Sequence, residues 1–281
     1  MTIKEAIKRG IEELNKNEIE EPHLKARMLL ENILEKSRQY IIANDEMNLN
    51  DEQENKYFCK IEKAIQHIPI EYLINKKEFM GIDFYVDENV LIPRQDTEIL
   101  VEEVIKIAQK TNAKKILDLC TGSGAIAVSL AKYLPQSEIT AIDISNGALK
   151  IAKKNAVSNN VENQITFISS DMFTNLNEEK FDIIVSNPPY IKTNVIDNLD
   201  IQVKNEPHIA LDGGKDGLYF YKKIINESYQ YLKYKGFLCL EIGFDQKIDV
   251  IELIENTNNF DGTYSKKDLY DNDRIIITQM K

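Results

Sequence analysis

The stretch Phe181-Asp182-Ile183-Ile184-Val185-Ser186-Asn187-Pro188-Pro189-Tyr190 decides how the rest of the chain is interpreted. Its apolar, β-branched centre, residues 183–185, predicts a buried strand. The strand must end at Pro188, because proline has no N–H for a sheet ladder and fixes φ. A residue before proline is pushed out of the α region, so Asn187 leaves the sheet in an extended conformation. The sequence therefore predicts an amide and an aromatic ring at the carboxyl end of a buried strand, where open α/β sheets bind ligands.

The composition is that of an ordinary globular protein with room for one large domain or two. The chain has 281 residues, of which 43% are hydrophobic and 29% charged. No apolar run approaches the roughly 20 residues of a membrane helix, and the N-terminus lacks the apolar core of a signal peptide. Cys59, Cys120 and Cys239 lie far apart and form no Cys-x-x-Cys pair, which argues against a zinc site. Sparse cysteines favour a reducing compartment, so we expect a cytoplasmic protein without a metal.

The net charge of −11 argues against binding of long nucleic acids. Proteins that bind a duplex usually present a basic stripe to its phosphates. Here lysine and acidic residues are interleaved, and no block of like charge exceeds a solvated helix face. We therefore expect neither a membrane nor a long nucleic acid as a partner.

Residues 1–75 carry helical patterns and little strand signal. Apolar residues recur at helical spacing over 3–14, 24–34 and 57–65, the last within a helix expected over 51–66. Thr2 and Glu5 fit a capping box, and Pro22 suits the first turn of the second helix. No catalytic constellation lies among these residues. We interpret 1–75 as a helical domain that docks a macromolecular partner.

The sequence predicts that residues 76–95 form a linker. The segment 79–86 around Gly81 predicts a short hairpin. Pro93 then interrupts an extended segment, and Asp96 or Thr97 is placed to cap the helix that follows.

From about residue 112 the pattern alternates between strand and helix. Strands are expected at 115–119, 138–143, 165–168, before Asn187, at 236–242 and at 274–278, and helices at 125–132, 148–159, 218–234 and 248–256. Strands that alternate with helices predict an α/β domain, 96–281, with a mainly parallel sheet covered on both faces.

The first of these strands leads into Asp118-Leu119-Cys120-Thr121-Gly122-Ser123-Gly124, a turn of the nucleotide-binding type. Its two glycines permit a tight turn and a close approach of backbone to ligand. Ala127 stands near the place of a third glycine, which disfavours a pyrophosphate at the helix N-terminus.

Acidic residues end the next two strands. Asp143, about 20 residues beyond the turn, is placed to accept hydrogen bonds from both hydroxyls of a ribose, or else to cap the next helix. Asp171 and Met172 are placed to hold an adenine, the carboxylate toward its amine and the thioether against its ring. Adenosine without phosphates suggests S-adenosylmethionine. Asp118 either supports the turn or meets the cationic methionine end of that ligand.

Together these segments resemble the Rossmann-like, class I S-adenosylmethionine-dependent methyltransferases that modify planar amino groups. Further segments narrow the resemblance to the release factor glutamine methyltransferases, the HemK/PrmC family. They are Ile92-Pro93-Arg94-Gln95-Asp96-Thr97-Glu98, residues 118–127, Glu206-Pro207-His208-Ile209-Ala210-Leu211 with Gly213-Gly214-Lys215-Asp216-Gly217-Leu218, and Leu240-Glu241-Ile242-Gly243. The resemblance covers essentially the whole chain. It implies a seven-stranded, mainly parallel sheet preceded by a small helical bundle.

The resemblance also implies the substrate and the partner. The substrate would be the glutamine of the Gly-Gly-Gln motif in peptide chain release factors, methylated at the side-chain nitrogen N5. The helical domain would dock the release factor. Separately from the resemblance, we expect a monomer. Three departures from the family pattern are visible: Cys120 for a glycine, Gln95-Asp96 for Pro-Glu, and Met172 for a larger apolar residue. They bear on cofactor affinity more than on reaction type.

The residues suggest how such an amide could be held. Its nitrogen lone pair is delocalised, so two acceptors must fix the N–H groups, and the Asn187 side-chain oxygen and the Pro188 carbonyl fit that need. The Tyr190 ring is placed to cover the planar amide, and Pro189 stiffens the loop. Two alternatives share the motif: an adenine-N6 methyltransferase acting on DNA or RNA, and a non-catalytic binding module on the same fold.

Overall fold

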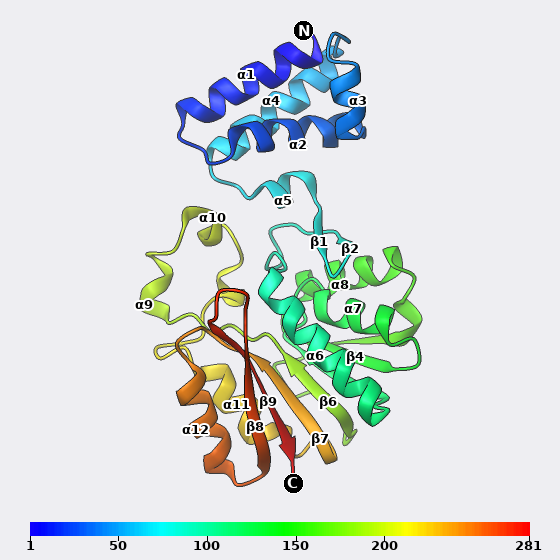
Figure 1. Ribbon diagram of the computed structural model, residues 1–281, viewed down its shortest axis with the longest axis vertical. Helices are drawn as coiled ribbons and strands as arrows, with labels where there is room; N and C mark the ends of the chain where they lie inside the picture. Colours follow the sequence, from blue (N-terminus) through cyan, green and yellow to red (C-terminus); the bar gives the residue numbers. More distant parts are fainter. The chain divides into compact units, whose positions relative to one another are not determined.

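The computed structural model describes residues 1–281, which form two compact units (Figure 1). The first, called the helical unit here, comprises Met1–Lys76 and Asp200–Asn205. The second, called the sheet unit, comprises Lys77–Leu199 and Glu206–Lys281. The hairpin that the sequence places in a linker, β1 Lys77–Phe79 and β2 Ile82–Phe84, thus belongs to the sheet unit. No helix in either unit combines the length and the apolar character needed to cross a membrane.

The helical unit contains the three predicted helices and three short ones that the sequence analysis missed. The predicted helices are α1 Ile3–Lys16, α2 Pro22–Leu34 and α4 Asp51–Ile65, and the short ones are α3 Arg38–Ala43, α5 Ile70–Ile74 and α10 Ile201–Lys204. The Thr2–Glu5 capping box and the proline at the start of α2 are confirmed. The short helices were missed because one or two turns carry too few residues to show a 3.6-residue period. Asn205, just after α10, donates from Nδ2 to the His67 carbonyl at 2.9 Å.

Helices α1 and α4 approach each other closely at Gly10 in the core of the helical unit. Tyr57 is fully buried there, and its hydroxyl has no hydrogen-bond partner. A Cβ placed on Gly10 would lie 2.2 Å from that hydroxyl oxygen and 3.0 Å from ring carbon Cζ. Gly10 is therefore required by close helix packing, although glycine weakens a helix interior by about 1 kcal/mol relative to alanine.

The sheet unit is an α/β domain with a single seven-stranded sheet, as the sequence predicts. The strand order is β5-β4-β3-β6-β7-β9-β8; the first five are parallel, and β9 runs antiparallel to both of its neighbours. The strands are β3 Lys115–Leu119, β4 Glu138–Asp143, β5 Ile165–Ser169, β6 Phe181–Ser186, β7 Leu232–Glu241, β8 Phe260–Lys267 and β9 Asp273–Met280. β6 is thus an interior strand, and Ile183, Ile184 and Val185 are fully buried in it.

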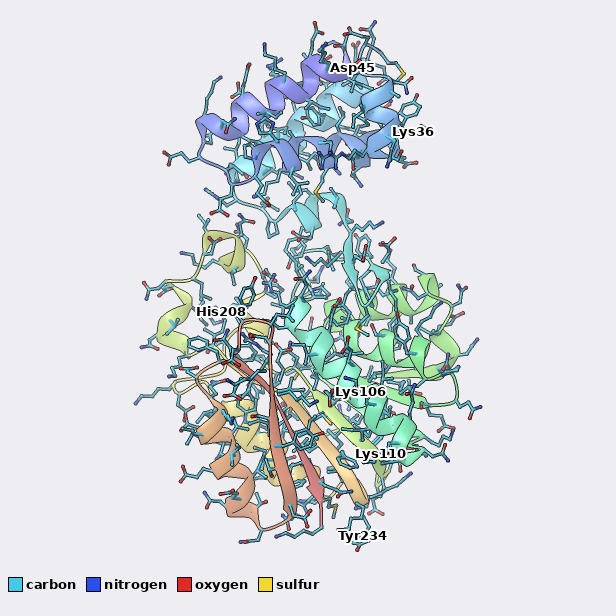
Figure 2. The ribbon with its side chains drawn as sticks, in the orientation of Figure 1. Lys36, Asp45, Lys106, Lys110, His208 and Tyr234 are labelled. Carbon is cyan, nitrogen blue, oxygen red and sulfur yellow. The ribbon has the colours of Figure 1, made fainter.

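Helices cover both faces of this sheet (Figure 1). One face packs against α6 Gln95–Thr111, α7 Ala125–Tyr133 and α8 Asn146–Ser158, and the other against α11 Tyr219–Ser228 and α12 Lys247–Thr257. The remaining short elements are α9 Thr193–Ile196, η1 Glu162–Gln164 and η2 His208–Ala210. Lys106 and Lys110, labelled on α6 in Figure 2, are exposed, whereas Ile107 and Ala108 between them are buried, as expected of an amphipathic covering helix.

Two expectations around α11 and β7 are wrong. The helix expected over 218–234 ends at Ser228, and the strand expected from Gly236 begins at Leu232. The aromatic and apolar residues 229–234 fit the repeat of a helix and that of a strand equally well. Pairing with β6 makes them part of a strand, since the Phe181 N–H donates to the Tyr231 carbonyl at 2.7 Å. Gly236 therefore lies inside β7, next to a bulge at which Lys235 takes a left-handed φ of 62°.

The expected cap of α6 is also wrong. Its N-cap is Arg94, without a side-chain capping bond, and Asp96 and Thr97 lie in the first helical turn. Both side chains are engaged elsewhere: Asp96 Oδ2 pairs with Arg274 Nε at 3.3 Å, and Thr97 Oγ1 accepts from Asn187. At the start of α6, contacts with distant residues therefore replace the capping hydrogen bond that the sequence predicted.

We predict that Gly10→Ala destabilises the helical unit, by about 1–3 kcal/mol for an overpacked core. Tyr57→Phe should be neutral or stabilising, because it removes a buried hydroxyl that has no partner. The double variant should recover part of the loss, since the closest contact involves that oxygen. Thermal unfolding of the full chain, followed by far-ultraviolet circular dichroism, measures all three. Equal losses from Gly10→Ala in both backgrounds would contradict this account.

Candidate active site

The carboxyl ends of the parallel strands converge on two adjoining cavities within the sheet unit. The larger has a volume of about 250 Å³, and the smaller about 50 Å³. Four residues line both: Leu91, Cys120, Gly122 and Asn187. Asn187 therefore stands where the two spaces meet. This is the sheet edge at which the sequence analysis expected ligand binding.

The turn after β3 has the conformation that its glycines suggest. Gly122 takes a φ of +55°, and a Cβ there would meet no atom within 4 Å, so its backbone is open to a ligand. Gly124 takes a φ of +80°, and a Cβ there would lie 3.0 Å from the Ala152 Cβ, so it permits close packing of α7 on α8. Cys120 adopts a φ of +61°. A residue with a side chain thus holds the left-handed conformation that glycine adopts without strain.

Thr121 and Asp118 stabilise this turn from inside the protein. The Thr121 hydroxyl donates to Asp118 Oδ2 at 2.6 Å, and Asp118 is fully buried. Burial raises the pKa of the Asp118 carboxyl to about 7. The other carboxyl oxygen, Oδ1, has no partner. Asp118 lines neither cavity, so of the two roles left open by the sequence the structure displays the supporting one.

Asp143 ends β4 and lines the larger cavity. Its Oδ2 accepts from the Gly122 N–H at 2.9 Å, and its Oδ1 from the Ser145 N–H at 2.8 Å. The residue that caps α8 is Ser145, whose hydroxyl accepts from the Ala148 N–H. Burial raises the pKa of Asp143. Because an ionised carboxylate offers about four lone-pair positions, Asp143 keeps capacity for further donors from the cavity.

Asp171 and Met172 follow β5 at the far side of the larger cavity. Met172 is buried and takes a left-handed φ of 51°. Asp171 is half exposed and pairs with Lys223 of α11, whose Nζ lies 3.0 Å and 3.1 Å from its two carboxyl oxygens. The structure therefore brings both residues to the cavity, with the Asp171 carboxylate already neutralised by a lysine.

Asn187 lines both cavities, whereas Pro188 and Tyr190 line neither. Asn187 Nδ2 donates to Thr97 Oγ1 at 3.1 Å, and its Oδ1 makes no hydrogen bond within the chain. The Pro188 carbonyl accepts no hydrogen bond either. Below them, the Ser186 hydroxyl donates to the Leu119 carbonyl at 2.8 Å and ties the end of β6 to β3. A side-chain and a backbone acceptor, adjacent in the chain, are thus both without an internal partner.

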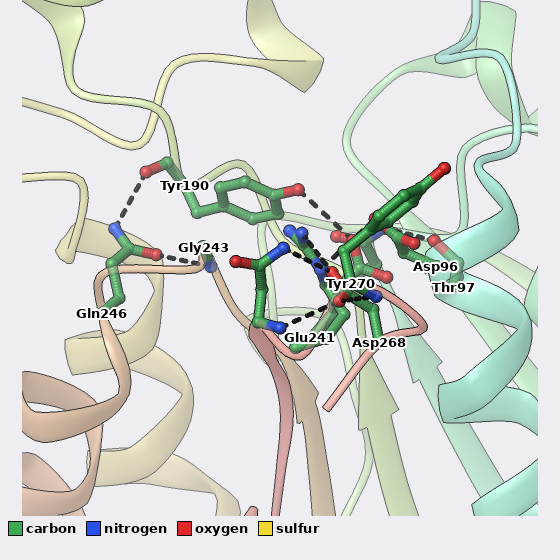
Figure 3. Close-up of polar contacts among 11 residues, drawn as sticks. Asp96, Thr97, Tyr190, Glu241, Gly243, Gln246, Asp268 and Tyr270 are labelled. Carbon is green, nitrogen blue, oxygen red and sulfur yellow. Dashed lines mark hydrogen bonds and ion pairs between the residues drawn. The ribbon is translucent and has the colours of Figure 1, made fainter. Parts of the chain in front are cut away.

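Tyr190 is held at both its backbone and its ring (Figure 3). Gln246 Nε2 donates to the Tyr190 carbonyl at 3.0 Å, and its Oε1 accepts from the Gly243 N–H at 2.9 Å. The Tyr190 hydroxyl donates to Glu241 Oε1 at 3.4 Å. Burial raises the pKa of this hydroxyl well above its usual range. Tyr190 therefore remains a neutral ring that is fixed in place.

The segment 206–218, which sequence reasoning quoted only for family resemblance, forms the support of this loop. The Ile191 N–H donates to the Leu211 carbonyl at 3.0 Å, and the Gly213 N–H to the Ile191 carbonyl at 2.8 Å. A Cβ on Gly213 would lie 2.7 Å from the Tyr190 Cα. At the start of the segment, buried Glu206 accepts from the Ile92 N–H at 2.9 Å and pairs with Arg94.

Sequence reasoning missed the roles of Thr97, Glu241 and Gln246. The first two lie in quoted segments, but only the folded chain shows what they touch. Nothing in the sequence singles out Gln246. No group of three or more His, Cys, Asp or Glu side chains is arranged to hold a metal ion, and His208 lies exposed in η2 (Figure 2).

Comparison with known proteins agrees with this architecture. The family described as "Methyltransferase small domain" matches residues 95–261, and the one described as "PrmC N-terminal domain" matches residues 5–74. The solved structure of the "hMettl16 catalytic domain in complex with MAT2A 3'UTR hairpin 6" has a TM-score of 0.58 at 15% identity and covers 83% of each chain. A likeness at that identity shows the fold. Fold and site together define a class I, Rossmann-like methyltransferase.

Two relatives identify the family. The "Release factor glutamine methyltransferase" of Clostridium botulinum is 39% identical over 98% of this chain and 98% of its own length. The protein of the same name from Clostridium acetobutylicum is 40% identical over 99% of this chain and 98% of its own. The chain belongs to the release factor glutamine methyltransferase family.

We predict that Gly213→Ala displaces the loop 187–190 and lowers kcat by about 10-fold or more, because misplacement of about 1 Å at a reacting centre costs up to about 100-fold. Affinity for S-adenosylmethionine should change little, since Gly213 lines neither cavity. Steady-state kinetics and calorimetry measure the two effects. Gly262→Ala in β8 is the control: its φ of +62° makes that alanine strained without any nearby atom. It should lower the midpoint of thermal unfolding and leave kcat unchanged.

Proposed function

We propose that the protein transfers a methyl group from S-adenosylmethionine to N5 of the glutamine in the Gly-Gly-Gln motif of peptide chain release factors, and so modulates translation termination. One observation supports this proposal: Asn187, which lines both cavities, and Pro188, which follows it, carry two unpartnered acceptors, Asn187 Oδ1 and the Pro188 carbonyl. The names of the full-length relatives supply the identity of the substrate.

The residues around the cavities suit the parts of S-adenosylmethionine. Asp143 would accept from the ribose hydroxyls, Met172 would pack against the adenine, and Asp171 would meet its amine in competition with Lys223. The turn residues Cys120, Thr121, Gly122, Ser123 and Gly124 would surround the methionine end, since all but Gly124 line the smaller cavity. Asp118, buried beneath this turn, would support it through its hydrogen bond from Thr121. When bound, the cofactor supplies a methyl group on a cationic sulfur.

The chain's own residues then hold the glutamine amide. Its two N–H groups would donate to Asn187 Oδ1 and to the Pro188 carbonyl, which fixes the nitrogen at the junction of the cavities. The Tyr190 ring would cover the planar amide, and Pro189 limits the freedom of the loop. As the nitrogen gains positive character, the two acceptors stabilise its N–H groups more strongly than in the ground state. The proposed reaction uses no metal and no dedicated general base.

The partner follows from the same proposal. The helical unit would dock the body of the release factor, and the enzyme would act as a monomer in the cytoplasm. The alternatives are not favoured: the relatives that match the whole chain are named for release factors, whereas the RNA-bound neighbour shares only the fold. The intact acceptors at Asn187 and Pro188 also count against a non-catalytic module.

The proposed activity predicts one methyl group on the Gly-Gly-Gln glutamine after incubation of a release factor with the enzyme and S-adenosylmethionine. Tandem mass spectrometry of the tryptic peptide locates the modification. A release factor with asparagine in place of that glutamine is the control and should remain unmodified. Methylated adenine in added RNA or DNA, with an unmodified glutamine, would reject the proposal in favour of the adenine methyltransferase.

The assigned roles predict opposite effects for two substitutions. Asn187→Ala should lower kcat by about 100-fold or more, as expected for loss of a group that stabilises the reacting centre, and should weaken cofactor binding little. Asp143→Ala should instead weaken S-adenosylmethionine binding, by about 10-fold or more for the loss of two charge-assisted hydrogen bonds. Calorimetry and single-turnover kinetics separate the effects. Turnover near that of the wild type in folded Asn187→Ala protein would show that its amide does not hold the substrate.

A further inference from the structure

Lys223 of α11 holds a residue of the larger cavity without lining that cavity itself. Its Nζ lies 3.0 Å and 3.1 Å from the two carboxyl oxygens of Asp171. Asp171 lines the larger cavity, whereas Lys223 lines neither cavity. The lysine therefore approaches the carboxylate from outside the space that a ligand would fill.

The backbone of Asp171 is fixed locally, but its side chain depends on this lysine. The Asp171 carbonyl accepts from the Thr174 N–H at 3.2 Å and from the Thr174 hydroxyl at 2.7 Å, which closes a turn after β5. The side chain is 51% exposed, and both hydrogen bonds to its carboxylate come from Lys223. Without the lysine, the carboxylate would be free to turn toward water.

Lys223 is itself held on two sides. Its Nζ lies 5.8 Å from the ring centroid of Tyr219, one helical turn earlier on α11, which is within the range of a cation–π contact. Tyr219 and Phe220 line the larger cavity and pack edge to face, with ring centroids 5.0 Å apart. Lys223 thus joins the first turn of α11 to the loop after β5, and both segments form the wall of the same cavity.

The lysine acts on Asp171 in two opposite ways. Its charge draws on the same carboxylate as the amine of a bound base would, which weakens the hydrogen bond to that amine. It also fixes the carboxylate before the ligand arrives, which removes an ordering cost from binding. An ionised carboxylate offers about four lone-pair positions, and the lysine engages one on each oxygen. Because the other positions stay free and the lysine approaches from outside the cavity, fixation outweighs competition.

We propose that Lys223 is a positioning residue for the cofactor, and that it holds the Asp171 carboxylate at the cavity wall, where the carboxylate accepts from the exocyclic amine of adenine. This inference deepens the proposed function and rests on it for the identity of the cofactor. The pair acts on affinity and on the selection of a base that carries an amine. The methyl transfer step itself does not depend on it.

Substitution of the two neighbouring lysines of α11 tests the role of Lys223. Lys223→Met keeps the length of the side chain and removes its charge, and we expect Kd for S-adenosylhomocysteine to rise by about 10-fold, with kcat at saturating S-adenosylmethionine within about twofold of the wild type. Lys222→Met is the matched control, because Lys222 pairs with Asp216, which lines neither cavity. It should leave Kd unchanged. Calorimetry and steady-state kinetics give the two constants.

A base without the amine tests what the fixed carboxylate recognises. The probe is the analogue of S-adenosylhomocysteine that carries hydrogen in place of the adenine amine. The wild type should bind it about 10-fold more weakly than S-adenosylhomocysteine, since a donor to a charged acceptor is lost. Lys223→Met and Asp171→Asn should both reduce this difference. The double variant should bind S-adenosylhomocysteine no more weakly than Asp171→Asn alone, because the lysine acts through Asp171.

Salt separates this role from a contribution to stability alone. The side chains of Lys223 and Asp171 are 28% and 51% exposed, so about 1 M potassium chloride screens their attraction. S-adenosylhomocysteine carries no net charge at neutral pH, so its binding reports the state of the pair. We expect high salt to weaken binding by the wild type and to have little effect on Lys223→Met. A purely structural pair would instead lower the midpoint of thermal unfolding on substitution and leave Kd unchanged.

The sign of the change in Kd decides between fixation and competition. Equal or tighter binding of S-adenosylhomocysteine by Lys223→Met, or an equal loss in Lys222→Met, would overturn the inference. A wild type that binds the amine-free analogue as tightly as S-adenosylhomocysteine would overturn it as well. These measurements use no release factor, so an unmodified release factor would reject the proposed substrate and leave the role of Lys223 standing. A wild type that binds no S-adenosylhomocysteine would reject the proposed cofactor, and this inference with it.

Discussion

The loop 187–190 must end an interior strand and still satisfy its backbone, and most of the site follows from that constraint. Two prolines remove two N–H donors, so the sheet ladder cannot continue past Ser186. Partners from distant segments replace it: Gln246 donates to the Tyr190 carbonyl, and Gly213 packs against the Tyr190 Cα. Two acceptors, Asn187 Oδ1 and the Pro188 carbonyl, remain without a partner in the fold, and Asn187 lines both cavities. The same break in the ladder thus produces both the rigidity and the free acceptors.

Two buried carboxyls flank the strand that carries this loop. In the sheet order β3-β6-β7, Asp118 lies on β3 opposite Val185, and Glu241 ends β7 one residue beyond the partner of Ser186. Burial raises the pKa of each to about 7, so at neutral pH each carries the desolvation cost of a partly ionised group. Groups perturbed in this way gather at functional sites because stability alone does not favour them. Asp118 holds the turn through Thr121, and Glu241 holds the Tyr190 ring.

The sequence predicts the sheet and the acceptors well. Prediction fails where a pattern of apolar residues fits both a helix and a strand, and where a residue's role depends only on tertiary contacts. Strands β3 to β6 are buried apolar runs bounded by turns, and they lie where expected. Residues 229–234 fit helix and strand alike, and pairing with β6 decided between them. Strand β8 was not located because, as an edge strand, it is mostly exposed and polar. At the site, Asn187 and Asp143 follow from their place at strand ends, whereas the support from Gln246 and Thr97 depends on contacts across the fold.

The path of the chain also ties the helical unit to the segments around the loop 187–190. After Tyr190 the chain continues through α9 and enters the helical unit at Asp200–Asn205, where Asn205 bonds to the His67 carbonyl. It then returns to the sheet unit at Glu206, which holds the backbone of Ile92. The chain thus crosses between the units three times, at residues 76–77, 199–200 and 205–206. Each short crossing removes conformational freedom. The helical unit is therefore connected covalently to the segment that follows Tyr190, at residues 199–200, and to the segment that supports it, at residues 205–206. A single flexible linker would provide no such connection.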